Sequence, residues 1–234
     1  MTRNALFIGG TKGLGHALSQ LAIADLCDVS IAGRTAHKCD LVREGRAMPF
    51  IVDLESEDMR PWVSMVQYDV IVWAAGIYQD GAFTTLTPNQ VMKCCRNHLV
   101  GPIALLTALF RSNKESARPC HLVVIGSSSA YRVRTDESLY GALKAAKAQL
   151  ARNLGKELPR DLPGSKVLLA NPGGMATPFW DGRDRDVSSF MDPKDVARVI
   201  WDEVRRQDTP FLEIQVIRQA DRSPKVEYGP RLPE

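Results

Sequence analysis

The sequence predicts an α/β fold, a doubly wound parallel sheet of about seven strands with helices on both faces in a single domain. Two observations predict it. Short apolar runs rich in β-branched residues recur along the 234-residue chain, and amphipathic stretches of helical length separate them. The first apolar run also leads directly into a glycine-rich turn. Strands that alternate with helices form parallel sheets, and right-handed crossovers make such a sheet doubly wound.

The predicted strands are short and almost continuously apolar, as expected for strands that helices cover on both faces. They are residues 5–8, 29–32, 49–52, 70–73, 122–125, 167–170 and 212–216.

The predicted helices cover residues 14–26, 55–66, 89–110, 138–158 and 192–207. Asp192-Pro193 is a typical helix start, an N-cap followed by proline at the first helical position. Pro61 weakens the second helix, and Gly101-Pro102 interrupts the third, which is either one long helix or two. We expect one dinucleotide-binding catalytic domain over residues 1–217 and a polar C-terminal tail over residues 218–234.

Composition narrows the class of protein. The formal charge is only +3 and no long basic run occurs, so a nucleic-acid partner is not expected. The five cysteines form no Cys-x-x-Cys, and the four histidines show no metal-ligand spacing, so we expect neither disulfides nor a metal. No apolar run is long enough for a secretory signal or a membrane span. We therefore expect a cytoplasmic protein without a membrane partner.

A glycine-rich turn follows the first predicted strand. Glycines at positions 9, 13 and 15 allow a tight turn and a close approach of the backbone to a pyrophosphate. The next helix offers unpaired N–H groups and the positive end of its dipole. The alternative is an ordinary glycine-rich connection. The predicted dinucleotide-binding residues here are Gly9, Thr11, Lys12, Gly13, Leu14 and Gly15.

The end of the second predicted strand indicates which dinucleotide is bound. It reads Ile31-Ala32-Gly33-Arg34-Thr35 and holds no carboxylate. In NAD-binding folds an acid at this place bonds the ribose 2′-hydroxyl. Arg34 can instead hold a 2′-phosphate with its fork of donors, Lys12 adds a second positive charge, and Thr35 offers a hydroxyl. These residues favour NADP(H), unless Arg34 and Lys12 are simply solvated.

Tyr140 and Lys144 are the main catalytic candidates. Their spacing of four places both side chains on one face of a helix. A free tyrosine has a pKa of about 10, and a nearby ammonium group is expected to lower it. Tyr140 could then exchange a proton with an alcohol or carbonyl oxygen. The alternative is a tyrosine–lysine pair on a solvated helix face.

A serine cluster ends the fifth predicted strand, thirteen residues before Tyr140. A serine hydroxyl in that place can hold the substrate oxygen beside the tyrosine. Ser127 fits the spacing best, and Ser128 is the alternative because the length of the intervening loop varies.

These motifs together resemble the short-chain dehydrogenase/reductase family. The G-x-x-x-G-x-G turn, the serine and the Tyr-x-x-x-Lys pair carry the resemblance, which extends from Gly9 to about Val216. It implies a Rossmann-like fold and an NADP-preferring oxidoreductase that interconverts a carbonyl and a secondary alcohol by hydride transfer. It also implies a homodimer or homotetramer that pairs through residues 99–110 and 142–158.

The resemblance assigns further residues to the cofactor. Asp53-Leu54 is similar to the family's Asp-Val pair, whose aspartate bonds the adenine amino group; a helix N-cap is the alternative role for Asp53. Lys144 is implied to bond the nicotinamide ribose. The other residues implied to contact the cofactor are Ala74, Ala75, Gly76, Pro172, Gly173, Met175 and Thr177.

The chain departs from the family pattern at two positions. Trp73 stands at or near the asparagine of the family's Asn-Ala-Gly signature. In the family's Asn-x-x-Gly pattern, which supplies a fourth catalytic residue, counting back from Gly101 reaches His98. Either His98 or the neighbouring Asn97 takes this role, or His98 is a packing residue.

Residues 176–191 are expected to form a lid over the substrate. Aromatic and arginine side chains in the lid and before Tyr140 suit a polar or anionic substrate with a flat group: Phe179, Trp180, Arg183, Arg185, Tyr131, Arg132 and Arg134. Two other functions compete with the reductase. A sugar epimerase or dehydratase normally needs a longer region after the sixth strand. The intact serine, tyrosine and lysine argue against a non-catalytic NADP(H)-binding sensor, and the departures at residues 73 and 98 keep that alternative open.

Overall fold

A single sheet of eight strands runs through the described residues of the computed structural model, which are 2–56, 67–230 and 232. The strand order is β3-β2-β1-β4-β5-β6-β7-β8, and β1 to β7 are parallel. The strands are β1 (Asn4–Ile8), β2 (Asp28–Ala32), β3 (Met48–Phe50), β4 (Val70–Trp73), β5 (His121–Ile125), β6 (Lys166–Pro172), β7 (Phe211–Arg218) and β8 (Pro224–Tyr228). The predicted doubly wound sheet is confirmed.

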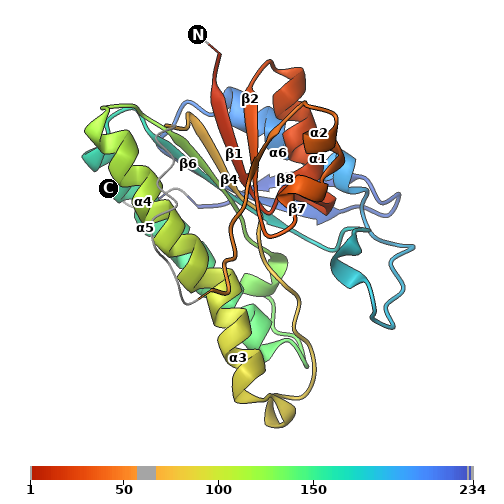
Figure 1. The fold of residues 1–234 in the computed structure, drawn as a ribbon. Coiled ribbons are helices and arrows are strands. Elements are labelled where there is room, and N and C mark those ends of the chain that lie inside the picture. Colours follow the sequence, from red (N-terminus) through yellow and green to blue (C-terminus); the bar gives the residue numbers. More distant parts are fainter. Residues whose placement is uncertain (1, 57–66, 231, 233–234) are drawn as a thin grey trace.

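Helices cover both faces of this sheet (Figure 1). One face is covered by α1 (Gly13–Ala24), α2 (Asp40–Arg43) and α6 (Pro193–Arg206). The other is covered by α4 (Gly101–Glu115) and α5 (Ser138–Asp161), and α3 (Pro88–Cys95) leads into α4. The predicted capping of α6 is present, because the Lys194 amide donates to the Asp192 carboxylate at 2.7 Å.

The two faces have separate apolar cores because neighbouring residues of a strand point to opposite sides. In β1, Phe7 packs toward α1 and α6, whereas Leu6 and Ile8 pack toward α4 and α5. All three are fully buried. No helix in the described part of the chain is long and apolar enough to cross a membrane.

The helix expected over residues 89–110 is continuous but irregular. It runs from Pro88 to Glu115 and contains one wider π-turn at Arg96–Val100. The π-turn precedes Pro102, whose missing N–H would weaken a regular α-helix at this place. Gly101 is required because a Cβ there would lie 2.3 Å from the Leu54 carbonyl oxygen. Most of the helix expected over 55–66 lies outside the described residues.

The polar C-terminal stretch differs from the expectation. The sequence suggests a tail from residue 218, but Pro224–Tyr228 forms β8, antiparallel to β7. A short turn joins the two strands, in which the Ser223 amide donates to the Asp221 carboxylate at 3.0 Å. The Tyr228 hydroxyl then donates to Glu203 of α6 at 2.9 Å. A five-residue strand with charged outward side chains carries little hydrophobic signal, so its pairing depends on the neighbouring β7.

Candidate active site

A cavity of about 700 Å³ lies at the carboxyl ends of the parallel strands. The chain forms β1, β2 and β3 toward one edge and then returns to place β4 on the other side of β1. The loops after β1 and β4 therefore diverge, and this divergence leaves a crevice in doubly wound sheets.

The serine, tyrosine and lysine of the motifs and the residues expected to bind the cofactor all line this cavity. They are Gly9, Thr11, Lys12, Gly13, Leu14, Gly15, Arg34, Thr35, Asp53, Leu54, Ala74, Ala75, Gly76, Ser127, Tyr140, Lys144, Pro172, Gly173, Met175 and Thr177. Residues from six different strand ends thus converge on one space.

The glycine turn fits its place through close backbone contacts. Gly9 has a φ of +89°, and a Cβ on it would lie 2.6 Å from the Ala75 amide nitrogen. A Cβ on Gly15 would lie 2.3 Å from the Gly9 carbonyl oxygen. Only glycine avoids both contacts without displacing the backbone. The turn therefore packs tightly against the loop after β4, and α1 begins within it at Gly13.

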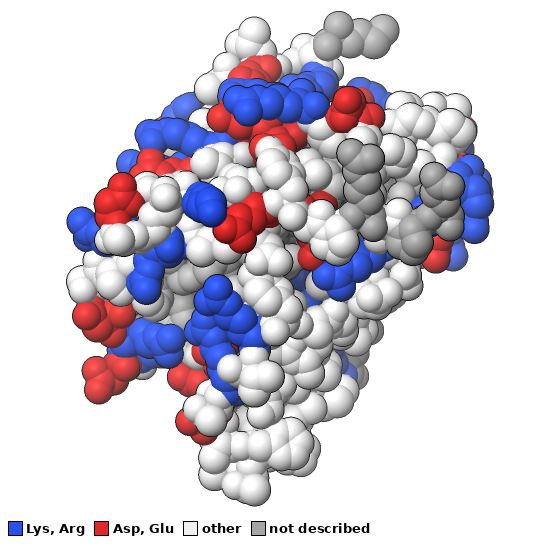
Figure 2. All heavy atoms as spheres, turned by 180° about the vertical axis from the view of Figure 1, so that it is seen from behind, with Lys and Arg blue, Asp and Glu red and all other residues white. Residues whose placement is uncertain are grey.

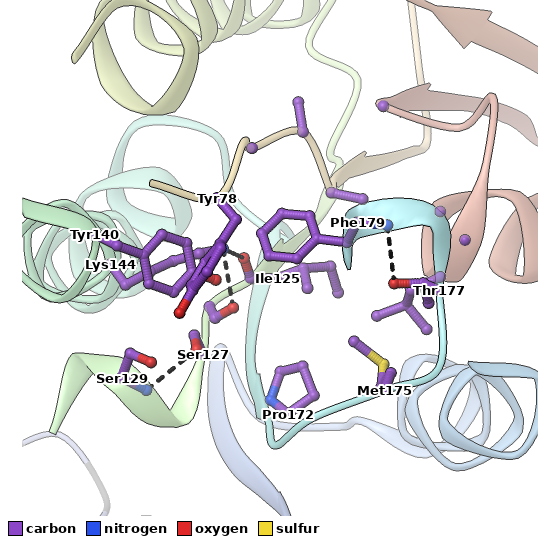
Figure 3. Close-up of a pocket in the computed structure, with 18 of the residues that line it drawn as sticks. Tyr78, Ile125, Ser127, Ser129, Tyr140, Lys144, Pro172, Met175, Thr177 and Phe179 are labelled. Carbon is purple, nitrogen blue, oxygen red and sulfur yellow. Dashed lines mark hydrogen bonds between the residues drawn. The ribbon is translucent and has the colours of Figure 1, made fainter. Parts of the chain in front are cut away.

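Ser127, Tyr140 and Lys144 lie together at the other end of the cavity (Figure 3). Ser127 follows β5, and the other two extend from α5 one turn apart. The Lys144 Nζ donates to the carbonyl oxygens of Gly126 at 3.1 Å and Ile125 at 3.3 Å. It lies 5.6 Å from the centroid of the Tyr140 ring. Helix α5 thus places an ammonium group between the end of β5 and the phenol.

Burial controls the protonation of this pair. Removal from water raises the pKa of Tyr140 above its ordinary value, and hydrogen bonding to Ser127 opposes that rise. Burial lowers the pKa of Lys144 to about 8. The net shift of the Tyr140 pKa is therefore opposite to the lowering expected from the sequence, because loss of phenolate hydration is its largest cause.

A buried polar network that the sequence analysis missed holds the backbone of Ser127. The Ser127 amide donates to Asn171 Oδ1 at 3.2 Å, and Asn171 Nδ2 donates to Glu213 at 3.0 Å. Arg152 of α5 binds the same carboxylate with two bonds of 2.7 and 2.8 Å. Asn171 lies near the end of β6, and Ser127 follows the neighbouring strand β5, so the place of Asn171 beside the serine could be found only from the sheet register.

Arg34 lies at the glycine-turn end of the cavity with its side chain about half exposed. Its guanidinium forms long ion pairs with Asp53 at 3.9 Å and Glu55 at 3.5 Å. Asp53 also accepts a hydrogen bond from the Glu55 amide at 3.0 Å. Two carboxylates therefore adjoin the arginine.

His98 and Asn97 lie within the π-turn, but they face different surroundings. His98 is fully buried, with its Nε2 2.6 Å from the Ile77 carbonyl oxygen and its ring edge-on to Tyr140. Burial lowers the pKa of His98 to about 3, so the ring is neutral. Asn97 lines the cavity and donates to Glu55 at 3.3 Å. His98 therefore supports the loop after β4, and Asn97 has the direct access to the cavity.

The lid residues pack as an aromatic cluster on Tyr78, a residue that the sequence analysis did not single out. Tyr78 contacts Tyr140, Trp180 and Phe179 at ring-centroid distances of 5.1, 4.8 and 5.7 Å. Figure 3 shows Tyr78 and Phe179 facing the cavity beside Tyr140. Arg183, expected to face the substrate, instead binds Asp80 and the Tyr78 carbonyl oxygen.

One group of possible metal ligands lies away from the cavity-lining residues. His16, Cys39 and Asp40 bring their ligand atoms within 4.8 Å of one another. His16 Nε2 lies 2.7 Å from Asp40 Oδ1, which is a direct hydrogen bond. The group thus has a structural explanation without an ion.

The doubly wound fold and the crevice at its strand ends place the chain among the Rossmann-like α/β proteins. Residues 3–188 match the profile of the short chain dehydrogenase family. The chain belongs to this family, and its general activity is that of an oxidoreductase.

The relatives are distant in sequence but cover most of the chain. The 1-deoxy-11-beta-hydroxypentalenate dehydrogenase of Streptomyces arenae is 28% identical over 222 residues, which is 86% of this chain and 78% of that protein. A short-chain dehydrogenase structure from Streptomyces avermitilis has a TM-score of 0.78 and 26% identity, covering 91% of this chain and 88% of that one. ElxO with NADP bound has a TM-score of 0.76 and 21% identity, covering 92% and 98%.

Proposed function

We propose that this protein is an NADP(H)-dependent oxidoreductase that interconverts a small carbonyl compound and a secondary alcohol, with Tyr140 as the general acid and base. The observation that carries the proposal is the shared cavity: Tyr140, Lys144 and Ser127 line the same space as the glycine turn. A dinucleotide held at the turn could reach the tyrosine within that space.

The residues present fit a phosphorylated dinucleotide. Lys12 and Arg34 stand beside the glycine turn, at the end where a 2′-phosphate would lie. At the other end, Pro172, Gly173, Met175 and Thr177 would hold the nicotinamide portion. When bound, the cofactor supplies or accepts the hydride. The NADP bound to ElxO, a structural neighbour, agrees with this proposal.

The protein's own groups would handle the proton. Because burial raises the pKa of Tyr140, its phenol is protonated at neutral pH and can donate to a carbonyl oxygen. Ser127 is placed to donate a hydrogen bond to the same oxygen. Lys144, whose pKa is about 8, is mostly protonated at neutral pH. Its positive charge would stabilise the phenolate that remains after proton donation.

The Tyr140→Phe variant tests this assignment against a non-catalytic sensor. We expect NADPH binding, followed by fluorescence, to be retained, and kcat to fall by about 100-fold or more because the proton donor is lost. The assays use a panel of aldehydes and ketones. Full activity in the variant would exclude Tyr140 as the acid, and absence of turnover in the wild type with tight NADPH binding would favour the sensor.

The cavity mouth suggests a polar or anionic substrate. Arg132, Arg134 and Arg185 line it, and the Arg185 guanidinium lies 5.2 Å from the Trp180 ring centroid. A substrate could place a flat group between the aromatic rings and an anionic group near these arginines.

We further propose a homodimer or homotetramer and a cytoplasmic location. Met92, Val100 and Ile103, on the helix that runs from α3 into α4, are exposed apolar residues. Figure 2 shows the end of the molecule that α3 forms as a mostly uncharged surface. All five cysteines are free thiols, as in reducing compartments. Light scattering of the purified chain tests the oligomeric state.

A further inference from the structure

A buried carboxylate forms part of the cavity wall next to Tyr140. Glu137, the residue before α5, is only 7% exposed and lines the cavity together with Tyr78 and Ser129. Its Oε1 accepts a hydrogen bond from the Tyr78 hydroxyl at 2.9 Å, and its Oε2 accepts one from the Ser129 hydroxyl at 2.8 Å. The Arg134 guanidinium lies 3.7 Å from Oε1, an ion pair rather than a hydrogen bond. Two hydroxyl donors and one guanidinium therefore surround this carboxylate.

The direction of these hydrogen bonds decides what the wall can bind. An ionised carboxylate only accepts, so each of the two hydroxyls uses its single proton on Glu137. Tyr78 and Ser129 can then offer only oxygen lone pairs to a ligand. Glu137 keeps spare accepting capacity, because Oε2 receives one bond from the described residues and each carboxylate oxygen has two lone pairs. Tyr78, Ser129 and Glu137 therefore form an acceptor wall.

This acceptor wall adjoins the reacting groups. The Ser129 amide donates to Ser127 Oγ at 3.1 Å, a contact drawn in Figure 3. The Tyr78 ring lies edge-on to the Tyr140 ring at 5.1 Å. When Ser127 and Tyr140 hold the carbonyl oxygen of a substrate, the groups attached to its carbonyl carbon would thus lie against the acceptor wall.

We infer that the acceptor wall makes this enzyme selective for carbonyl compounds that carry a hydroxyl or amino donor on the carbon next to the carbonyl. The inference rests on the proposed function, whose substrate class it specifies. A ligand with a donor there can donate a hydrogen bond to Glu137. A ligand without one removes water from the spare acceptor sites of the wall and offers no donor in its place. The aromatic rings of Phe179 and Trp180 beside Tyr78 indicate that the rest of the substrate is flat and apolar near this wall.

Three ketones with a common ring test the inference. 2-Hydroxy-1-phenylethanone has the donor on the carbon next to the carbonyl. 2-Methoxy-1-phenylethanone keeps the oxygen without the donor, and acetophenone has neither. With NADPH as reductant, we expect kcat/KM for the hydroxy compound to exceed that for the methoxy compound by about 10-fold or more. The methoxy compound controls for the effect of an α-oxygen on carbonyl reactivity. 2-Amino-1-phenylethanone shows whether an amino donor gives as high a kcat/KM as a hydroxyl donor.

The Glu137→Gln variant connects the preference to the wall. Its amide can donate as well as accept, so the ratio between the hydroxy and methoxy compounds should fall toward one. The control is Glu44→Gln, at an exposed glutamate that pairs with Arg46 and lies outside the cavity-lining set. Glu44→Gln should leave the ratio unchanged. Ser129→Ala, which removes a hydroxyl rather than a charge, should reduce the ratio less, and thermal melting with NADPH titration confirms that each variant is folded.

Equal kcat/KM for the three ketones in the wild type would overturn the inference and leave the reductase proposal intact. An unchanged ratio in folded Glu137→Gln would overturn it as well. If none of the ketones consumes NADPH, the proposed function fails for this class. Calorimetry with the NADP⁺ complex then decides, since 1-phenylethane-1,2-diol should bind about 10-fold more tightly than 1-phenylethanol, and equal affinities would refute the acceptor wall.

Discussion

The Nζ of Lys147 lies 4.1 Å from the centroid of the Trp73 ring and 3.2 Å from the Trp73 carbonyl oxygen. Lys147 is fully buried on α5, and it also donates to the Ala75 carbonyl oxygen at 3.3 Å. Ala75 is the residue that contacts Gly9. Lys147 therefore braces the loop after β4 against the glycine turn, at the place where Trp73 departs from the family signature. Together with Lys144, it supplies donors to the ends of two adjacent strands.

Replacing Lys147 by Met should destabilise the fold and weaken cofactor binding. The buried carbonyl of Trp73 and the half-buried carbonyl of Ala75 would lose a donor, which costs about 1–3 kcal/mol for an unsatisfied buried group. The loss should lower the melting temperature by several degrees and reduce NADPH affinity, because the loop that touches Gly9 is less constrained. Lys194→Met, at an exposed lysine of α6, is the matched control. Equal melting curves for the two variants would contradict the bracing role.

The reduction rate should depend on the charge of Lys144. Its pKa is lowered from 10.5 to about 8, so the ammonium form predominates below pH 8 and is lost as the pH rises above it. We expect kcat/KM for reduction to fall across that range, because the charge that stabilises the Tyr140 phenolate disappears. In Lys144→Met the rate should be low and this pH dependence absent. A wild-type profile that rises through pH 8 would argue against the assignment.

Arg34 should determine the preference for NADPH. Removing the guanidinium in Arg34→Ala takes away the donors to a 2′-phosphate and leaves Asp53 and Glu55 to repel it. NADPH affinity should fall about 10- to 100-fold, a loss of about 1.4–2.8 kcal/mol, while NADH affinity changes little. Arg43→Ala on α2 is the control at an exposed arginine outside the cavity-lining set. A wild-type preference for NADH in fluorescence titration would reverse our view of Arg34.

Asn171 should matter for the position of Ser127. In Asn171→Asp the acceptor oxygen remains, but a second carboxyl group would face Glu213 where the amide donated at 3.0 Å. Repulsion should raise the pKa of the introduced carboxyl group in the folded protein. The substitution therefore lowers the free energy of unfolding little at low pH. The loss grows as the pH rises through the pKa of the introduced carboxyl group. The test compares the melting temperatures of Asn171→Asp and Asn171→Ala at pH 5 and at pH 8. A difference between the two variants that is no larger at pH 8 than at pH 5 would count against this prediction.

Much of the fold and site follows from local pattern. The strand runs, the Asp192-Pro193 helix start and the glycine turn depend on neighbouring residues, so the sequence predicts them directly. Motif spacing likewise singles out Ser127, Tyr140 and Lys144, which line one cavity. The sequence does not predict strand β8, because this strand depends on its pairing with β7 and shows little of the hydrophobic pattern usual for a strand.

The doubly wound topology and the motif residues of the cavity can be read from the chain alone, because both follow from periodicity and from motifs within short segments. The direction of the Tyr140 pKa shift comes from the packing of the folded chain, since desolvation depends on everything that surrounds the phenol. The tertiary structure also decided the roles of Glu137, Lys147 and Asn171, whose partners come from distant strands and loops. A polar residue in a helix or turn has no assigned partner until the fold brings one within hydrogen-bond distance, so its function is a property of the packing.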